Sequence, residues 1–396
     1  MLFQSIELIH TAPWLLPFVT LPRLARRTPN LSDAPSASGR LVSVIIPAPN
    51  EATTIERVVR SILASTYGPL ELLVVDDRST DDTFRRVERI QDDRVRVVRG
   101  GDLPDGWYGK PWACYQGYRE ARGELLLFTD ADTYHQPELL ERAVGALLTQ
   151  GVDLVTVSPV QRCVTFWERI VMPQIWFLLA LRYTPGSVNR ATRRRDVIAN
   201  GQFILTTRSA YVAAGTHRAV RHEVAEDLAL AQAYLGTGRK LHFSHAERLM
   251  ETRMYQGLAH MVEGWSKNVY LGGRRSFPDE PIQRALVPVI LVIALGFWLV
   301  PPAVLVGGLV SPRLAQYSGS ALAAIAYSAV FWMLICHGMR IPALYGLGYP
   351  LGALVALYIV LRSTWRGERK VEWKGRVYKG SGKAGRRERR KAGRNN

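Results

Sequence analysis

Cysteine is scarce in this chain, and its placement points away from metal binding. Only Cys114, Cys163 and Cys336 occur among 396 residues. None of them stand at the short spacings that zinc ligands adopt, and Cys336 lies in an apolar run. The sequence therefore predicts neither a disulfide framework nor a zinc site, and it is typical of a protein from a reducing compartment.

Acidic residues are also few compared with basic ones. The chain has 51 lysines and arginines against 34 acidic residues, a formal net charge of +17. Residues 362–396 hold 14 of the basic residues and three acidic ones, so this stretch supplies eleven of the seventeen excess charges. Such a basic cluster predicts an anionic partner. Because no aromatic residue follows Tyr378, we expect anionic lipids of a bacterial inner membrane and no nucleic acid.

Charged residues are almost missing from three long runs, residues 285–310, 320–339 and 341–361. Each is long enough to cross a bilayer, which takes about 20 residues. The basic tail and the polar part of the chain are both expected on the cytoplasmic side, which requires an even number of crossings. One run must then be re-entrant or lie in the interface, and Pro301-Pro302 make the first run the candidate for a broken, hairpin-like segment.

These patterns divide the chain into five parts. No segment near the start has a convincing signal-peptide cleavage site. We expect a multi-pass protein of the cell membrane with its polar domain and tail in the cytoplasm. The parts are an N-terminal membrane anchor or interfacial helix (1–27), a linker (28–39), a folded domain (40–281), a membrane region of two to three apolar segments (282–362) and a basic cytoplasmic tail (363–396).

Strand-like and helix-like patterns alternate within the folded domain. This order predicts an α/β fold with a mainly parallel sheet, whose ligands bind at the carboxyl ends of the strands. Ser79 or Thr80 is expected to cap the second helix, with Asp81 and Asp82 in its first turn. The predicted strands are 41–48, 70–77, 94–100 and 124–132, and the predicted helices between them are 50–65, 79–90 and 109–123. The apolar stretch 165–183 is expected to be either a core helix or an interfacial helix that leads a lipid to the site.

Acidic residues follow three of the predicted strands: Glu51 the first, Asp76 and Asp77 the second, and Asp130 and Asp132 the fourth. They could simply cap the helices that come next. Because parallel strands end at one edge of a sheet, however, convergence on a ligand site is the better interpretation.

The sequence FTDAD places Asp130 and Asp132 directly after a buried strand. Two such carboxylates repel each other and resist leaving water, unless a cation lies between them. Mg²⁺ or Mn²⁺ suits them, since these ions take one or two carboxylates and fill their shell with phosphate oxygens. No GxxxxGK[ST] loop is present, so the cation would hold a diphosphate. Lys110 either adds positive charge there or is an exposed lysine at a helix start.

The motifs SVIIPAPNE, LLVVDDRSTDDT, FTDAD and VAEDLAL follow one another over about residues 41–270. In this order they resemble the motifs of inverting family 2 glycosyltransferases, which implies a GT-A nucleotide-sugar-binding domain. The stretches GWYGKPWAC, EGWSKNVY (263–270) and WKGRVY (373–378) are similar, more narrowly, to the membrane glycosyltransferases of hopene and carotenoid glycosylation.

The resemblance implies a role for each motif residue. Asp77 would contact the uracil–ribose part of the donor, and Pro47, Glu51, Lys110 and Asp130 would complete the donor site. Asp130 and Asp132 would bind the metal. Asp227 would be the catalytic base with Glu226 beside it, and Trp265 and Lys267 would shape the acceptor site.

The resemblance therefore implies inverting transfer of a hexose, with UDP-glucose as the expected donor, to a membrane lipid. A carotenoid or a hopanoid-type terpenoid is the expected acceptor. Two alternatives remain. A processive polysaccharide synthase would carry a QxxRW-type element, which the stretch MYQGLAHMVEGWSKN lacks. A non-catalytic membrane scaffold would not need Asp77, Asp130, Asp132 and Asp227.

Overall fold

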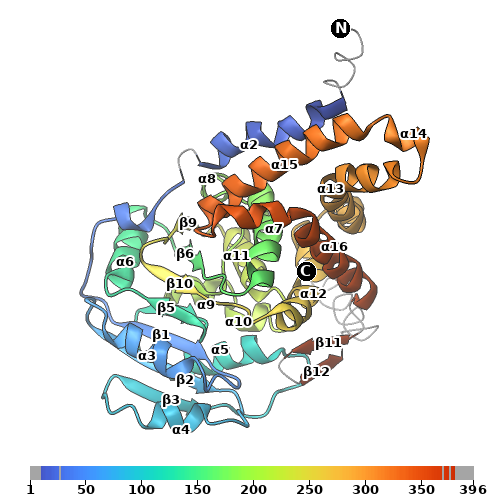
Figure 1. Ribbon diagram of the computed structural model, residues 1–396. Helices are drawn as coiled ribbons and strands as arrows, with labels where there is room; N and C mark the ends of the chain where they lie inside the picture. The colour runs from blue at the N-terminus through green and yellow to red at the C-terminus, as the bar shows by residue number, and fades with distance from the viewer. Residues whose placement is uncertain (1–9, 26–27, 368–369, 374–375, 380–396) are drawn as a thin grey trace.

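A seven-stranded sheet lies at the centre of the polar domain, with strand order β3-β2-β1-β4-β8-β6-β9. The computed structural model describes residues 10–25, 28–367, 370–373 and 376–379 (Figure 1). The strands of this sheet are β1 (Val42–Pro47), β2 (Leu70–Asp76), β3 (Val95–Arg99), β4 (Leu125–Thr129), β6 (Leu154–Ser158), β8 (Phe203–Thr207) and β9 (Leu241–His245). Two smaller sheets contain β5 (Thr133–His135), β7 (Val160–Gln161) and β10 (Met250–Thr252), and β11 (Lys370–Trp373) with β12 (Arg376–Lys379).

Helices cover both faces of the sheet and continue beyond it. Those of the polar domain are η2 (Leu31–Asp33), α3 (Ile55–Leu63), α4 (Thr83–Glu88), α5 (Gly109–Glu120), α6 (Leu139–Thr149), α7 (Phe166–Arg182), α8 (Pro185–Val188), η3 (Arg194–Asp196), α9 (Arg208–Ala213), α10 (Thr216–Ala219), α11 (Glu226–Gly236) and α12 (Leu258–Arg275). The remaining helices are η1 (Ala12–Leu15), α2 (Leu16–Ala25), α13 (Pro281–Gly308), α14 (Pro312–Ala315), α15 (Ser318–Gly338), η4 (Ala343–Gly348) and α16 (Tyr349–Arg366).

The predicted mainly parallel sheet is confirmed. Strand β1 runs parallel to both neighbours, with Val42 opposite Leu70 of β2 and Leu125 of β4. Strand β8, which the sequence pattern did not reveal, runs antiparallel to β4 and β6. Because β1, β2 and β4 are adjacent and parallel, the residues that follow them meet at one edge of the sheet.

The alternation of side chains along β1 divides the core between the two faces. Val44 and Ile46 face the helices α3 and α6, whereas Ile45 faces α5. Gly117 of α5 lies so close to the sheet that a Cβ there would stand 2.5 Å from the Ile45 side chain. This close packing fixes α5, and therefore Lys110 near its start, against the end of the sheet.

The predicted start of the second helix is wrong. Helix α4 begins at Thr83, and Asp82 occupies its N-cap without a capping hydrogen bond from its side chain. The Asp81 carboxylate accepts hydrogen bonds from the backbone N–H groups of Ala52 and Thr83. Residues 79–81 therefore bind the loop after β1 and cannot also form the first turn of a helix.

The predicted linker, residues 28–39, is packed against the domain. Leu31 is buried in the core, and Ala37 N–H donates to the Glu141 carbonyl of α6 at 3.1 Å. The absence of a side chain at Gly145 leaves room for this segment, because a Cβ there would overlap the Pro35 carbonyl oxygen.

Three helices are long and apolar enough to cross a membrane, over Pro281–Gly308, Ser318–Gly338 and Ala343–Arg366. The prediction that prolines break the first of them is wrong, since α13 continues through Pro301 and Pro302. A proline at 301 leaves the Phe297 carbonyl without its usual helical donor. The Trp14 indole N–H donates to that carbonyl at 3.3 Å, which satisfies it without interrupting the helix.

The N-terminal segment packs on these helices. The Trp14 ring stacks on Phe297 of α13, and Phe18 meets Phe331 of α15 edge to face. Figure 1 shows α2 alongside α15, on the side of the molecule opposite β3 and α4. Residues 1–9 and 26–27, part of the predicted anchor, lie outside the described residues, as do most of the predicted tail and part of the 373–378 motif.

Candidate active site

A cavity of about 830 Å³ opens beside the carboxyl ends of β1 and β4. It brings together every residue predicted from the motifs except Asp77. The predicted residues in its lining are Pro47, Glu51, Lys110, Asp130, Asp132, Glu226, Asp227, Trp265 and Lys267.

Asp77 lies outside this lining. Its side chain is 1% exposed, and its Oδ1 stands 3.7 Å from the guanidinium of the neighbouring Arg78. Contact between Asp77 and the donor base therefore stays a prediction.

Two loops at the end of the sheet hold each other in place. Asn50 N–H donates to Ser79 Oγ at 3.0 Å, and Thr80 N–H donates to Asn50 Oδ1 at 2.8 Å. Glu51 N–H donates to Thr83 Oγ1 at 2.7 Å. Asn50 adopts a left-handed conformation with φ 53°, which asparagine tolerates better than most residues. These bonds position Glu51 on the wall of the cavity.

Lys110 forms two ion pairs in the cavity. It is the second residue of α5, yet its side chain is only 20% exposed, so the alternative of an exposed lysine at a helix start is wrong. Its Nζ lies 2.7 Å from Asp130 Oδ1 and 2.9 Å from Glu226 Oε1. Burial lowers the pKa of Lys110, but the carboxylates of Asp130 and Glu226 outweigh this effect and raise it well above its usual value.

Glu226 and Asp227 occupy the first turn of α11, where the helix dipole favours negative charge. Gly201 N–H and Leu228 N–H donate to the two oxygens of the Asp227 carboxylate at 3.0 and 2.7 Å. Burial raises the pKa of Asp227 above the ordinary aspartate value, and the negative charge of Glu226 adds a smaller increase. Burial would also raise the pKa of Glu226, but its pairing with Lys110 lowers it. The pKa of Asp227 is thus raised and that of Glu226 lowered. A raised pKa suits Asp227 to accept a proton.

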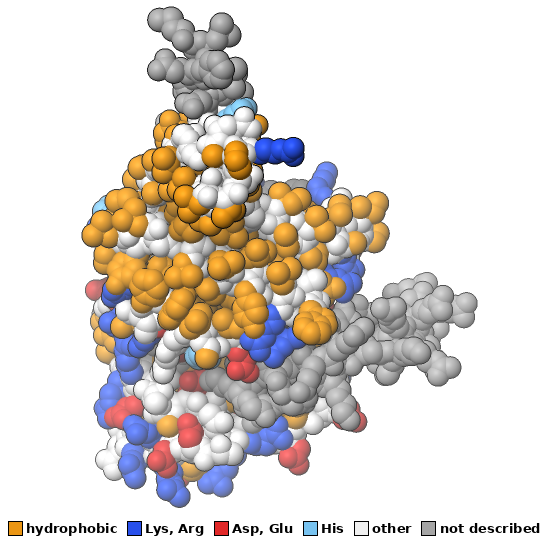
Figure 2. Space-filling model, turned by 45° about the vertical axis from the view of Figure 1, so that its right-hand side comes forward, with side chains coloured by type: hydrophobic (Ala, Val, Ile, Leu, Met, Phe, Trp, Pro, Cys, Tyr) orange, Lys and Arg blue, Asp and Glu red, His pale blue; other side chains and the backbone are white. Residues whose placement is uncertain are grey.

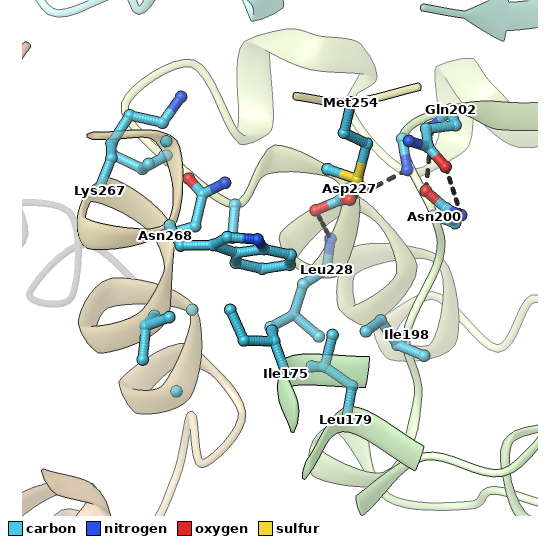
Figure 3. Close-up of a pocket in the computed structure, with 18 of the residues that line it drawn as sticks. Ile175, Leu179, Ile198, Asn200, Gln202, Asp227, Leu228, Met254, Lys267 and Asn268 are labelled. Carbon is cyan, nitrogen blue, oxygen red and sulfur yellow. Dashed lines mark hydrogen bonds between the residues drawn. The ribbon is translucent and has the colours of Figure 1, made fainter. Parts of the chain in front are cut away.

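Helix α12 contributes Trp265 and Lys267 to the opposite wall. Burial lowers the pKa of Lys267 to about 8, although the negative charge of Glu226 opposes the shift. Trp265 is 7% exposed, and its indole N–H has no hydrogen-bond partner among the described residues. Figure 3 shows Lys267 and Asn268 projecting from α12 on one side of the cavity and Asp227 on the other.

Asp130 and Asp132 have the chemistry that a divalent cation requires. Both carboxylates belong to the cavity lining at the end of β4, and the Thr252 hydroxyl lies 3.4 Å from Asp132 Oδ1. Within the described part of the chain, no three His, Cys, Asp or Glu side chains gather as metal ligands. A Mg²⁺ or Mn²⁺ ion fits such a site because it takes two carboxylates and fills its remaining positions with phosphate and water oxygens.

The far end of the cavity is apolar. Here the wall is formed by helices that lie beyond the sheet: α7, α13 and α16. Figure 3 shows Ile175 and Leu179 of α7 facing the same space as Asp227. The apolar lining includes Ile175, Leu178, Leu179, Val287, Ile290, Leu291, Leu295, Ala356, Ile359 and Val360.

The sequence interpretation missed the segment before β8. Gly201 holds Asp227 through its N–H, and a Cβ at this position would stand 2.8 Å from Lys110 Nζ and 3.2 Å from Asp227 Oδ2. The Asn200-Gly201 dipeptide before an apolar run was a turn signal that could have pointed to it. Helix α7 was also left undecided between a core and an interfacial position. It is buried along Val171–Gln174 and covered by α16, and it also lines the cavity.

A comparison with family models supports the motif interpretation. Residues 43–228 match the model described as glycosyl transferase family 2. These residues form a family 2 glycosyltransferase domain. The protein is accordingly a glycosyltransferase, and the predicted recognition and enzyme class are confirmed.

Two of the similar proteins match most of the chain. The 4,4'-diaponeurosporenoate glycosyltransferase of Staphylococcus aureus strain USA300 is 28% identical over 349 residues, which cover 86% of this chain and 88% of the relative. The solved structure of the mannosyltransferase PcManGT from Pyrobaculum calidifontis, in complex with GDP-Man and Mn²⁺, is 19% identical with a TM-score of 0.53. The match covers 92% of this chain and 100% of the PcManGT chain. This likeness and the mainly parallel sheet confirm the predicted GT-A fold.

Proposed function

We propose that this glycosyltransferase transfers a hexose, with inversion, from a nucleotide sugar to a membrane lipid. The observation that carries the proposal is the cavity that joins the carboxylates at the end of the sheet to an apolar wall built from α7, α13 and α16. A polar donor and an apolar acceptor can therefore meet beside Asp227. UDP-glucose is the donor we favour.

The donor end follows from the charges on the cavity wall. Asp130 and Asp132 would hold Mg²⁺ or Mn²⁺, and the complex of PcManGT with GDP-Man and Mn²⁺ supports a divalent ion. The ion would neutralise charge that develops on the leaving nucleoside diphosphate. Lys110 adds positive charge at the same place, while Pro47 and Glu51 shape the wall and Asp77 reaches the uracil–ribose part.

The acceptor end supplies the base. Inverting transfer is one displacement at the anomeric carbon, in which the acceptor oxygen attacks as its proton leaves. The Asp227 carboxylate takes that proton. Gly201 and Leu228 hold the carboxylate in position through their N–H groups. Trp265 and Lys267 border the place of the acceptor oxygen, and the indole N–H of Trp265 is available to donate to it.

The acceptor we favour is a carotenoid or a hopanoid-type terpenoid. The resemblance to the 4,4'-diaponeurosporenoate glycosyltransferase supports this class, because that relative's name describes action on a carotenoid. The apolar cavity wall and the three helices long enough to cross a membrane support a lipid in general. We place the enzyme in the cell membrane, with the family 2 domain and the basic tail on the cytoplasmic side, where anionic lipids attract the tail.

The rate of transfer should depend on pH through Asp227. Since the base acts in its ionised form and its pKa is raised, activity should fall on the acid side with a midpoint above about 4, the value of an unperturbed aspartate. Replacing Glu226 with glutamine removes one of the two causes of the shift, so the acid limb should move to lower pH. A pH–rate profile of kcat/KM for both proteins measures this. An unchanged acid limb in Glu226→Gln would contradict the assignment of Asp227.

Sugar transfer by the full-length protein in detergent tests the proposal. Radiolabelled UDP-glucose, Mg²⁺ or Mn²⁺, and total lipid from a bacterium that makes carotenoids and hopanoids are supplied, and label is followed into the organic phase. We expect label in lipid only with the metal, and its loss in Asp132→Ala. Asp82→Ala, on the exposed N-cap of α4, is the matched control.

Two other outcomes would revise the proposal. Metal-dependent hydrolysis of the donor with no label in lipid would keep the donor site and reject the acceptor class. No transfer and no hydrolysis with any nucleotide sugar would reject the donor site and favour the scaffold alternative.

A further inference from the structure

After α12 the chain contacts the polar domain again at two places, at Arg340 and along α16. Helix α13 leaves the domain and α15 comes back, joined by α14, so the two form a helical hairpin, α13–α15. Just after α15, the guanidinium of Arg340 lies 3.7 Å from Glu247, which follows β9 of the central sheet. The chain is therefore beside the domain again before α16 begins.

Helix α16 touches the domain at both of its ends. Near its start, Gly352 packs so closely on α7 that a Cβ would stand 2.1 Å from the Ile170 carbonyl oxygen. Near its end, Tyr270 N–H of α12 donates to Ser363 Oγ at 2.9 Å. Fourteen residues separate Tyr349 from Ser363, about 21 Å of helix. This length of α16 lies along the surface of the domain, over α7 and α12. Strand β11, which follows α16, also contacts α12.

The two faces of α16 differ. Small or buried residues of α16 face its neighbours: Gly352 lies on α7 and Ser363 meets α12, whereas Ala353 and Ala356 pack against α13. Exposed apolar residues recur on the other face at steps of three and four, the spacing of one helix stripe: Leu351, Leu354, Tyr358, Leu361 and Trp365. Figure 2 shows hydrophobic side chains gathered over the upper part of the molecule, on the side that carries α13, α14 and α16, and charged ones below.

A bilayer-crossing α16 would conflict with its neighbours. Helix α16 packs along α13 and also along α7 and α12, so a bilayer-crossing α16 would draw α7 and α12 into the membrane with it. Helix α7 carries Glu168 and Arg169 at one end and Arg182 at the other, and α12 carries an exposed Glu263. Charged side chains inside a bilayer are costly. A helix with one apolar stripe instead suits the membrane interface.

We propose that α16 lies in the membrane interface along the family 2 domain and does not cross the bilayer, so that the hairpin α13–α15 is the only part that inserts deeply among the described residues. The chain then enters and leaves the membrane on one side, and the C-terminal strands stay on the side of the active site. Ala356, Ile359 and Val360 of α16 also line the cavity, so the acceptor would enter from the leaflet that faces the domain.

Labelling of single added cysteines with a membrane-impermeant maleimide tests this topology in the full-length protein. Arg85→Cys reports the domain, since Arg85 lies on α4 with a side chain 74% exposed. Ser381→Cys reports the segment after β12. The parent protein is the blank, because Cys114 and Cys336 are buried and Cys163 is partly buried. Each variant is labelled in inverted vesicles, in spheroplasts and, as a reactivity control, in detergent.

We expect both cysteines to react in the same preparation and to lose labelling in the other. Reaction of Arg85→Cys only in inverted vesicles and of Ser381→Cys only in spheroplasts would overturn the proposal, because α16 would then cross. Reaction of both only in spheroplasts would support the even number of crossings that the proposal requires and overturn the cytoplasmic orientation. The outcome does not depend on the identity of donor or acceptor, so it separates this inference from the proposed activity.

Discussion

Replacement of Asp227 by asparagine is expected to lower the rate of sugar transfer by about 100-fold to 10,000-fold, the usual contribution of a general base. Asparagine has nearly the same shape but cannot take the acceptor's proton. Its single oxygen can still accept one of the two hydrogen bonds, from Gly201 N–H or from Leu228 N–H, so the wall of the cavity should remain. Initial rates with saturating donor measure the loss, and calorimetric binding of UDP with metal should show donor affinity retained.

Asp82→Asn is the matched control for this substitution. It makes the same change of aspartate to asparagine on the exposed start of α4, where the Asp82 carboxylate pairs with Arg85 at 3.6 Å. Its activity should stay close to that of the parent. If Asp227→Asn kept transfer within tenfold of the parent, the base would have to be another group, and Glu226 would be tested next.

Replacement of Lys110 by methionine is expected to lower the free energy of unfolding by about 3 kcal/mol, because it leaves a buried charge without its partner. Methionine fills a similar volume, but Asp130 and Glu226 then keep two carboxylates near Asp227 without the cation that Lys110 supplied. Transfer should fall as well, since Lys110 lowers the pKa of Asp227 and its loss favours the protonated base. Thermal unfolding in detergent and initial rates measure the two effects.

A second substitution separates the effect of charge on stability from the effect of packing. In Lys110→Met/Glu226→Gln one of the two stranded carboxylates is neutral, so the double variant should be more stable than the sum of the single effects predicts. Lys240→Met, at an exposed position, is the control and should change stability by less than about 0.5 kcal/mol. Additive effects in the double variant would show that the ion pair of Lys110 with Glu226 does not stabilise the fold.

Local patterns in the sequence were sufficient for the strands β1 to β4 of the central sheet and for the residues that follow them. The apolar runs before Asp77 and Asp130 are the strands β2 and β4, and both ends lie at the same edge as Glu51. Strand order in a βα repeat follows from connection length and handedness, so the end of each strand could be assigned to one edge in advance. Pro47, Glu51, Asp130 and Asp132 lie in one cavity for this reason, whereas Glu226, Asp227, Trp265 and Lys267 reach it from the helices α11 and α12.

The predictions that failed depended on partners distant in the sequence. Thr80 and Asp81 were expected in a helix start, but the loop after β1 supplies their hydrogen-bond partners. Pro301 was expected to break α13, but Trp14, 283 residues away along the chain from the Phe297 carbonyl it satisfies, replaces the missing donor. A propensity describes a residue and its near neighbours only, and tertiary contacts override it.

By itself the sequence determined the enzyme class, because the chemistry of the family 2 domain needs particular side chains at the ends of strands that can be read from local patterns. Only the tertiary structure decided how the charge at the active site is balanced and where the apolar helices lie. Lys110 pairs with Glu226, more than a hundred residues away along the chain, and α16 packs against α7, α12 and α13. Hydropathy measures the length of an apolar run, whereas its neighbours determine whether that run spans the membrane or lies along it.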